Sequence, residues 1–311
     1  MTDDLRTRLD SLATEAHRPE LAGLDRLPTA EIAALMNAED AGVPAAVARR
    51  LPEITAAVDA ITERLAKGGR LVYAGAGTAG RLGVLDAAEC PPTFGTDPGQ
   101  VVALIAGGAE AVLNAVEGAE DSRRAAVADL TAIGLTADDA VVGIAASGRT
   151  PYAVAAVEHA RALGALSVGL ACTADSELGA AAEHAIEVVV GPELLTGSTR
   201  LKAGTAQKLV LNMLSTITMV RLGRTYGNLM VDLRATNEKL RARCHRIVTL
   251  ATGADREAVD RALAATGGEV KPAILALLTG LAPEPAARLL AEHGGRLRDA
   301  VDAAPGTIRT P

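Results

Sequence analysis

The stretch GRLVYAGAGTAGRLGVLDAAECPPTFG, residues 69–95, decides the fold that we expect for this chain. Within it, Leu71–Ala74 is a short apolar run, which is typical of a strand buried on both faces. The run leads into Gly75–Gly80, a Gly-x-Gly-x-x-Gly turn, and a segment of helical length follows. We expect this helix to stop at Cys90, because the proline after it disfavours the α conformation there. The stretch therefore predicts a strand, a glycine turn and a helix.

Four further apolar runs continue this pattern, at Val101–Ile105, Val141–Ala145, Ser167–Ala171 and Ile186–Val190. Segments of helical length follow the first three of them. The alternation of buried strands and helices predicts an α/β fold with a doubly wound parallel sheet. Ligands of such sheets bind at the loops beyond the carboxyl ends of the strands, so these loops are expected to carry the chemistry.

Three regions of the chain differ in pattern. Residues 1–54 show helical spacing interrupted by prolines and predict an N-terminal helical segment. Residues 55–225 contain all five apolar runs and predict the sheet domain, while residues 226–311 predict a linker helix and a small helical C-terminal domain. We expect the core of that last domain to be formed by Leu263, Ile274, Leu275, Leu277, Leu278 and Leu289.

Composition argues against several classes of protein. With 3 Tyr, 1 Phe, no Trp and a net charge of −7, the chain lacks base-stacking side chains and a basic footprint, so no nucleic-acid partner is expected. Cys90, Cys172 and Cys244 are far apart and predict neither a disulfide framework nor a metal site. No uncharged apolar run reaches the ~18–20 residues of a membrane span, and the N-terminus lacks the pattern of a signal peptide. We therefore expect a cytoplasmic protein without a membrane partner.

The glycine turn can be explained in three ways. A dinucleotide site would need an acidic residue about 20 positions on, at the end of the second strand. That strand is followed by Ala106-Gly107-Gly108 without a carboxylate, which makes dinucleotide binding the least favoured explanation. We expect instead that Gly77 and Thr78, with the helix N-terminus behind them, bind a single phosphate. A turn that needs glycine only for its backbone geometry is the alternative.

Two other loops carry hydroxyls and cations just before a helix. The residues concerned are Ser147, Arg149 and Thr150 after the third strand, and Ser198, Thr199 and Lys202 before a long apolar helix. Hydroxyls and a cation beside the positive end of a helix suit a phosphate dianion. A simple N-cap is the alternative for Ser147 and Thr150. Three such loops on one sheet edge predict a small phosphorylated ligand.

Two carboxylates lie near these loops. Glu89 is at the end of the first helix after the sheet begins, and Glu120 follows the second strand, 31 positions later. Because this separation is about one strand-helix unit, both can lie near adjacent loops. A single glutamate on a helix is more often a solvated surface residue, and spacing by itself does not select these two.

Together these segments resemble the N-acetylmuramic acid 6-phosphate etherase family. The resemblance runs from about residue 30 to the C-terminus and is carried by residues 69–95, 145–152, 196–208, 227–232 and 235–240. It implies a sugar-isomerase (SIS) domain with a small helical C-terminal domain, acting as a homodimer without a cofactor or metal. It also implies cleavage of the lactyl ether of an amino-sugar phosphate, which gives N-acetylglucosamine 6-phosphate and D-lactate during peptidoglycan recycling.

The resemblance also assigns roles to residues. Glu89 matches the proton donor of the family and Glu120 its second catalytic acid. Ala79 and Ala88 stand where the family usually has serine. The missing hydroxyl at Ala79 leaves Thr78 and the loop amides to hold more of the phosphate.

The implied reaction is a β-elimination. Opening of the sugar ring exposes an aldehyde at C1, which acidifies the proton on C2. A base removes this proton, an acid protonates the departing lactate, and water adds at C3. We expect Glu120 to be the base and Glu89 the acid, with the difference between them arising most simply from deeper burial of Glu89.

Two other functions on the same fold stay open at this point. A non-catalytic sugar-phosphate sensor, similar to the animal glucokinase regulatory protein, would bind a sugar phosphate and change its contacts with a partner. An aldose–ketose isomerase would need a base near C2 but no acid at C3. The presence of both Glu89 and Glu120 favours the etherase.

Overall fold

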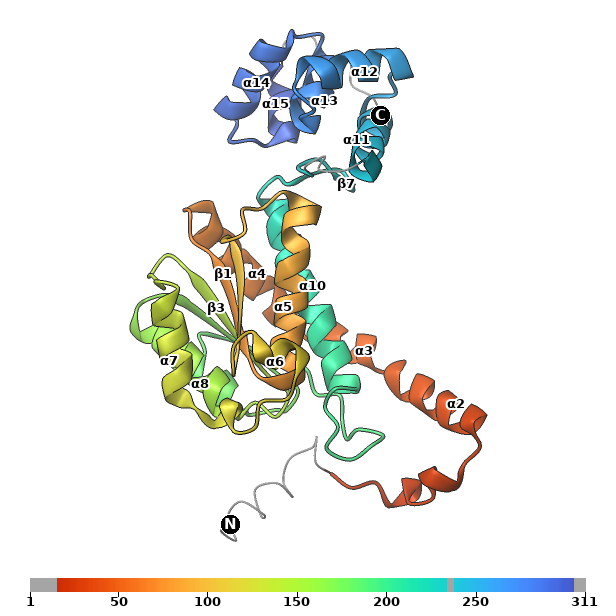
Figure 1. Ribbon diagram of the computed structural model, residues 1–311, viewed down its shortest axis with the longest axis vertical. Coiled ribbons are helices and arrows are strands. Elements are labelled where there is room, and N and C mark those ends of the chain that lie inside the picture. The colour runs from red at the N-terminus through yellow and green to blue at the C-terminus, as the bar shows by residue number, and fades with distance from the viewer. Residues whose placement is uncertain (1–15, 234–237, 305–311) are drawn as a thin grey trace. The chain divides into compact units, whose positions relative to one another are not determined.

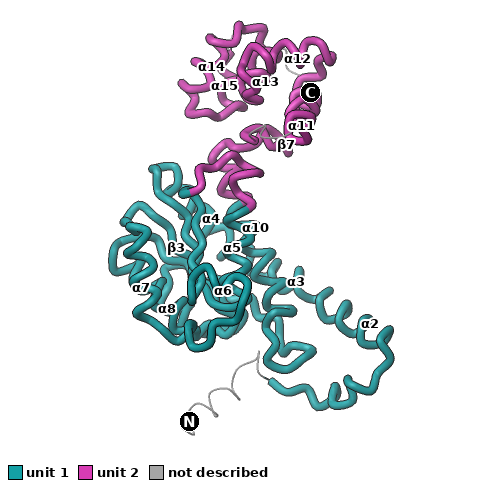
Figure 2. The backbone as a smooth tube through the Cα atoms, in the orientation of Figure 1, with its two compact units in different colours: residues 1–88, 99–215 teal, residues 89–98, 216–311 magenta. Residues whose placement is uncertain are grey.

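The computed structural model describes residues 16–233 and 238–304, and Figure 1 shows their elements. Residues 235–237, within one segment of the family resemblance, lie outside the described residues. Packing divides the chain into two compact units, which Figure 2 colours separately. Unit 1 holds the described residues of 1–88 and 99–215, and unit 2 those of 89–98 and 216–311. The domain limits at 54/55 and 225/226 stay predictions.

The N-terminal part of unit 1 is helical. Its elements are η2 (Pro19–Leu21), η3 (Leu24–Arg26), α2 (Thr29–Asp40), α3 (Val43–Ala48) and α4 (Leu51–Ala66). Pro52 lies in the first turn of α4, where a missing amide hydrogen leaves no helical bond unmade. Ile54, Val58, Ile61 and Leu65 recur at helical spacing and are buried, so one face of α4 packs against the rest of the unit.

Five parallel strands form the sheet of unit 1. They are β1 (Leu71–Gly75), β2 (Val101–Ile105), β3 (Ala140–Ala145), β4 (Leu166–Ala171) and β5 (His184–Glu187), and their order is β2-β1-β3-β4-β5. The doubly wound parallel sheet is thus confirmed. The chain changes direction across the sheet between β1 and β3, so the loops that follow these two strands flank the switch point.

The last strand lies earlier than its sequence predicts. We expected Ile186–Val190, and the structure has β5 at His184–Glu187. The edge strand β5 pairs only with β4, and Glu187 is the partner of Ala171, the last residue of β4. The strand assignment therefore ends where its neighbour ends, although the apolar pattern continues.

Helices cover both faces of the sheet (Figure 1). The elements are α5 (Gly77–Phe94), α6 (Glu110–Leu113), η4 (Ala119–Asp121), α7 (Arg123–Ala132), α8 (Pro151–Ala162), α9 (Glu177–Ala181) and α10 (Lys202–Arg221). Leu130 of α7 and Tyr152 of α8 pack on one face, against Val72 and Val141. On the opposite face α4 contacts β3, β4 and β5, and Tyr73 of β1 donates a hydrogen bond to Asp86 of α5. Period-2 alternation along β1 thus divides its side chains between two helical layers.

Helix α5 extends beyond the point where its sequence predicts an end. The prediction of a stop at Cys90 was wrong, because the helix continues to Phe94 with Pro91 and Pro92 inside it. A proline cannot donate to the carbonyl one turn earlier, but it can still accept a bond from the following turn. The amide of Gly95 makes this bond to the carbonyl of Pro91, at 3.0 Å, and closes the last turn.

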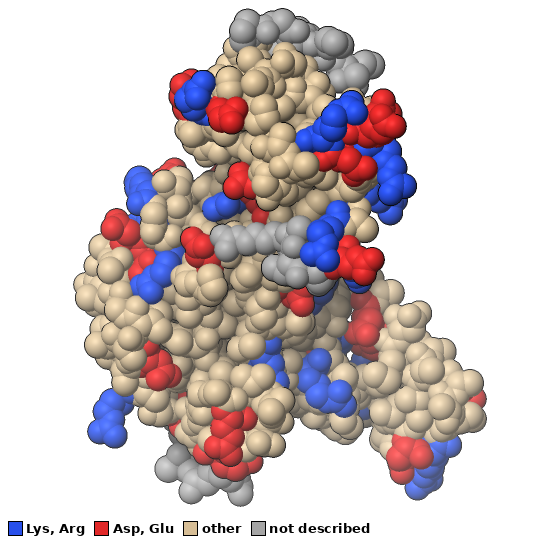
Figure 3. Space-filling view, turned by 45° about the horizontal axis from the view of Figure 1, so that its top comes forward, with Lys and Arg blue, Asp and Glu red and all other residues tan. Residues whose placement is uncertain are grey.

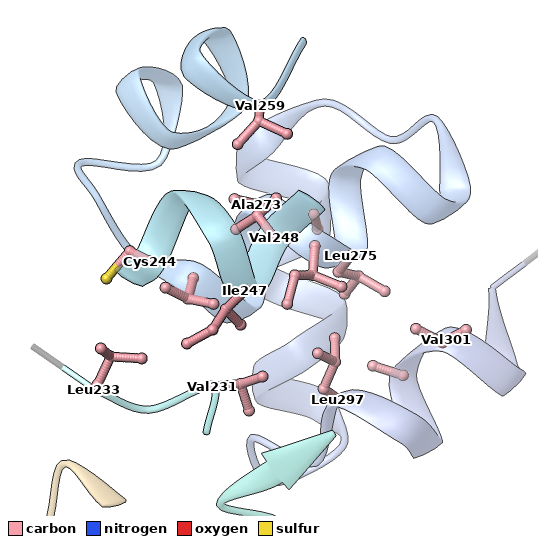
Figure 4. Close-up of a cluster of buried hydrophobic side chains, with 14 residues drawn as sticks. Val231, Leu233, Cys244, Ile247, Val248, Val259, Ala273, Leu275, Leu297 and Val301 are labelled. Atoms are coloured by element: carbon pink, nitrogen blue, oxygen red, sulfur yellow. The ribbon is translucent and has the colours of Figure 1, made fainter. Parts of the chain in front are cut away.

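Besides the last residues of α5 and α10, unit 2 contains a short hairpin and a helical bundle that follows it. Its elements are β6 (Thr225–Tyr226), β7 (Leu229–Met230), α11 (Glu238–Thr252), α12 (Arg256–Ala265), α13 (Val270–Thr279), α14 (Pro283–Glu292) and α15 (Leu297–Ala303). Figure 4 shows the core, in which Val248, Leu275 and Leu297 come from three different helices. All six residues predicted for this core belong to it, Ile274 and Leu275 as buried members and four leucines packed around them.

Candidate active site

A pocket of about 190 Å³ opens beyond the carboxyl ends of β1 and β2. Gly77 lines it from the turn after β1, and Arg81 lines it from α5. Residues 114–120, which follow β2, form another part of its wall. The structure therefore brings Gly77 and Glu120, both predicted as site residues, to one pocket.

The loop that carries Glu120 is tied to α5. Glu120 belongs to η4 and its side chain is exposed. Arg81 of α5 bonds to the segment that precedes this loop. Its guanidinium donates from Nε to the carbonyl of Val112 at 2.9 Å and from Nη2 to the carbonyl of Asn114 at 2.8 Å. These two bonds fix the segment that leads to Glu120 relative to the glycine turn.

The loops after β1 and β3 place hydroxyls and a guanidinium at the switch point. Thr78 lies in the first turn of α5, and Ser147, Arg149 and Thr150 follow β3. All four are partly exposed. Among the described residues, Thr150 caps no amide of α8 with its hydroxyl, so the N-cap alternative does not explain this residue. Within residues 16–233 and 238–304, the Ser147 hydroxyl accepts one long bond of 3.3 Å, from the amide of Arg149.

Gly148 gives the β3 loop its shape. Its φ of +65° lies in the left-handed region, and a Cβ at this position would lie 2.3 Å from Cβ of Ser176. Ser176 cannot retreat easily, because its hydroxyl donates to Glu187 at 2.8 Å and accepts from the amide of Gly179 at 2.9 Å. The loop thus lies directly against the start of α9, and only glycine fits there.

The third predicted loop, before α10, is arranged differently from the expectation. Ser198 and Thr199 are partly exposed, but the side chain of Lys202 is only 8% exposed and its ammonium lies 2.5 Å from Glu39 of α2. The hydrogen bond from Lys202 holds the pKa of Glu39 below its usual value. In the single chain Lys202 is therefore bound to a carboxylate, and its role in phosphate binding stays a prediction.

Glu193 lies in the third loop and was not predicted from the sequence as a residue of the candidate site. It is fully buried, and its two oxygens accept from the amides of Lys202 and Ala203 at 3.0 and 2.9 Å. A carboxylate thus occupies the N-terminus of α10, where we expected a phosphate. No signal in the sequence marks this role, because Glu193 precedes the helix by nine positions in an irregular loop.

Glu89 lies on the outer side of α5 and is exposed. Its neighbours Ala87 and Cys90 point inward, with 8% and 2% exposure, which leaves the outer side of the helix to Glu89. Deeper burial of Glu89 was expected and is not found in the single chain. The unit division falls between Ala88 and Glu89, so the pairing of Glu89 with Glu120 stays a prediction.

One turn before Glu89, Asp86 forms a buried network that the sequence did not reveal. Its carboxylate accepts from the Tyr73 hydroxyl at 2.7 Å, from the Asn212 amide at 2.6 Å and from the Ser215 hydroxyl at 3.1 Å. Burial raises the pKa of Asp86, although these three bonds oppose the shift. The network joins β1, α5 and α10.

Among the described residues no three His, Cys, Asp or Glu side chains are grouped so that they could hold a metal ion. Cys90, Cys172 and Cys244 are buried and form no disulfide within the described part of the chain. Burial together with the nearby Glu193 raises the pKa of Cys172 to about 12. No single helix in the described part is long and apolar enough to cross a membrane.

Relatives with known names align with most of this chain. An N-acetylmuramic acid 6-phosphate etherase from Streptomyces avermitilis is 71% identical over 301 residues, which cover 97% of each chain. One from Streptomyces coelicolor is 74% identical over 88% of each chain, and one from Escherichia coli O81 is 55% identical over 87% of this chain and 91% of its own. The chain belongs to the N-acetylmuramic acid 6-phosphate etherase family. The etherase family resemblance in its sequence is thereby confirmed.

Family models and a solved structure agree on the fold of this etherase family member. Residues 53–161 match the glucokinase regulatory protein N-terminal SIS domain, and residues 123–217 match the SIS domain. A phosphoheptose isomerase from Francisella tularensis superposes with a TM-score of 0.51 at 18% identity, covering 62% of this chain and 100% of its own. This likeness concerns the fold alone, and it confirms the SIS architecture.

Proposed function

We propose that this chain cleaves the D-lactyl ether at C3 of N-acetylmuramic acid 6-phosphate and releases N-acetylglucosamine 6-phosphate and D-lactate. The observation that carries the proposal is its identity of 55–74% to relatives named for this etherase. The sheet-edge pocket with Glu120 and the hydroxyl-bearing loops supports it. The activity is that of a carbon–oxygen lyase in peptidoglycan amino-sugar recycling.

The phosphate is proposed to bind at the switch point between β1 and β3. Amides and hydroxyls of Gly77, Thr78, Ser147 and Thr150, with the Arg149 guanidinium, supply the donors that a dianion needs. Thr78, Ser147, Arg149 and Thr150 are partly exposed, which leaves their side chains accessible to a ligand. Ser198 and Thr199 belong to a third loop at the same edge of the sheet. Lys202 would bind the phosphate only after its bond to Glu39 is replaced by one to the phosphate.

With the phosphate held there, the two carboxylates act on the open-chain sugar. Glu120 takes the proton from C2, the electron pair forms the C2–C3 double bond, and the C3–oxygen bond breaks. Glu89 donates a proton to the departing lactate oxygen, and water then adds to C3 while C2 regains a proton. Each acid or base role typically accelerates the reaction ~10²–10⁴-fold. Both carboxylates are exposed in the single chain. The surroundings that make Glu120 the base and Glu89 the acid therefore have to come from bound substrate or from a second subunit.

The same proposal includes a homodimer that works without a cofactor in the cytoplasm. Elimination and hydration move protons and water but no net electrons between substrate and product, so the chemistry requires no redox group. Large apolar side chains at Leu85, Leu113 and Leu195 are 53%, 87% and 55% exposed, which supports a second copy as their cover. On the face drawn in Figure 3, acidic and basic residues are interspersed, which favours a small ligand over a nucleic acid.

The test is incubation with N-acetylmuramic acid 6-phosphate in ²H₂O and H₂¹⁸O. We expect release of D-lactate, deuterium at C2 and ¹⁸O at C3 of the product. Binding without any D-lactate release would instead support a regulatory protein, the function suggested by the glucokinase regulatory match. A ketose product would support an isomerase.

A further inference from the structure

Arg81 is the cation of the sheet-edge pocket. Among the described residues that line this pocket it is the only lysine or arginine, whereas Glu117 and Glu120 contribute two carboxylates. Its described partners are two neutral carbonyls, those of Val112 and Asn114, and it forms no ion pair with residues 16–233 or 238–304. The positive charge of Arg81 is therefore not neutralised by a carboxylate of the described chain.

The substrate of the proposed function is itself an acid at this position. Its lactyl group carries a carboxylate two bonds from the ether oxygen that leaves C3, and Glu120 must act on the adjacent C2. The substrate carboxylate thus enters a pocket that already holds Glu117 and Glu120. The negative charges of the substrate carboxylate, Glu117 and Glu120 repel one another, and this repulsion opposes binding unless a cation lies among them.

Arg81 also has donors to spare. A guanidinium carries five N–H groups, and the two carbonyl bonds use one on Nε and one on Nη2. The remaining groups include both hydrogens of Nη1, and two adjacent N–H groups match a carboxylate in a bidentate fashion. The two carbonyl bonds hold the guanidinium in place before the substrate arrives, which reduces the entropy lost on binding.

We infer that Arg81 binds the carboxylate of the lactyl group and so selects lactyl ethers over sugar phosphates that lack this group. The inference rests on the proposed function. It assigns to Arg81 a role in substrate specificity rather than in proton transfer, which remains with the two glutamates. It also explains why an otherwise acidic pocket contains one arginine without a carboxylate partner.

The experiment compares two ligands that differ in the lactyl group. KM is measured for N-acetylmuramic acid 6-phosphate, and the inhibition constant is measured for N-acetylglucosamine 6-phosphate, which has no carboxylate. We expect Arg81→Gln, which keeps an amide to bond one carbonyl, to raise KM roughly 10- to 100-fold, the loss typical of a charged hydrogen bond. The inhibition constant should stay unchanged, and Arg81→Lys should fall between Gln and the wild type.

Arg64 provides the matched control. Its guanidinium likewise donates to two carbonyls, those of Ala137 and Gly164, in the loops before β3 and β4 at the other edge of the sheet. Arg64→Gln should leave both constants unchanged. A melting curve of each variant shows whether it folds, and if Arg81→Gln does not fold, Arg81→Lys carries the same comparison.

Two results would overturn the inference. Equal weakening of both ligands would place Arg81 at the phosphate or in the fold, and a lower kcat with unchanged KM would reduce it to a positioning residue for the Glu120 loop. Failure of the proposed function is a separate result, since it shows as absence of D-lactate release by the wild-type protein.

Discussion

The ammonium of Lys202 lies 2.5 Å from Oε2 of Glu39, a residue 163 positions earlier in the chain. The other oxygen of Glu39 accepts from Arg18 at 2.7 Å. Glu39 belongs to α2 and Lys202 opens α10, so this ion pair fastens the N-terminal helices to the sheet domain. A cation that the sequence predicts for phosphate binding is thus also a structural contact.

We expect Lys202→Met to lower the free energy of unfolding by about 1–3 kcal/mol, because it leaves the part-buried Glu39 with Arg18 alone. The double variant Glu39→Gln/Lys202→Met should lose less free energy of unfolding than the sum of the two single changes, as measured by denaturant unfolding.

Titration with N-acetylglucosamine 6-phosphate tests the predicted role of Lys202 in phosphate binding. Lys202→Met should weaken binding and Glu39→Gln should not, and equal effects of both would count against a phosphate contact.

A second prediction concerns acid stability. Burial alone would raise the pKa of Asp139, but bonds from the Arg70 guanidinium and from the amides of Thr136 and Arg70 outweigh it and lower the pKa. A carboxyl with a lowered folded-state pKa contributes stability above its unfolded value near 3.8, and that contribution is lost as the pH falls through the folded pKa.

Asp139→Asn should therefore lower the free energy of unfolding at pH 7 by about 1–3 kcal/mol, since it removes the negative charge that pairs with Arg70, whose guanidinium keeps its bonds to the carbonyls of Ile133 and Gly134. The gap between wild type and variant should narrow as the pH falls below 3.8. Urea unfolding at a series of pH values measures both quantities. A gap that is constant down to the lowest pH would contradict the prediction.

The β3 loop gives a third prediction. Gly148→Ala forces a Cβ to 2.3 Å from Ser176 in a left-handed backbone, and we expect it to weaken both folding and sugar-phosphate binding. Gly134→Ala is the control, because Gly134 has a φ of +60° with nothing within 4 Å of its added Cβ. The control should show only the backbone penalty of about 1–2 kcal/mol and normal binding. Identical behaviour of the two variants would show that the close approach to Ser176 is unimportant.

The fourth prediction concerns the separate roles of Glu120 as base and Glu89 as acid. Glu120→Gln should abolish both hydrogen exchange at C2 and release of D-lactate, because no base then removes the C2 proton. Glu89→Gln should slow lactate release ~10²–10⁴-fold while exchange at C2 continues. Nuclear magnetic resonance in ²H₂O follows both processes in one sample. Exchange that is lost in the Glu89 variant and kept in the Glu120 variant would reverse the assignment.

Much of the fold was predictable because a buried strand shows as a short run of apolar residues in the local sequence. The apolar run at Val101–Ile105 coincides with β2, and the leucines of unit 2 form its core as expected. The end of α5 was not predictable, since a proline restricts the residue before it but the bond from Gly95 that closes the turn depends on where the chain goes next.

The site was predictable only in part. Loops after parallel strands meet at one edge of the sheet, so the loops with Gly77, Ser147 and Thr150 were expected to lie beside the switch point, and they do. Contact of these residues with a phosphate stays a prediction. The partners of Lys202 and Asp86, Glu39 and Asn212, were not foreseeable, because they lie far away along the chain and have no local pattern. Long-range contacts of this kind are set by packing rather than by periodicity.

The strand order has a consequence for synthesis of the protein. Thr78 and Ser147, in the loops on either side of the switch point, are 69 positions apart, and their loops come to the same edge only after β1 has paired with β3. A nascent chain that has emerged from the ribosome only as far as β2 therefore carries only one of the two loops at which we propose that the phosphate binds. If a sugar phosphate binds at both loops, it stabilises by mass action only those chains in which β1 and β3 have already paired, and incomplete sheets gain nothing from it.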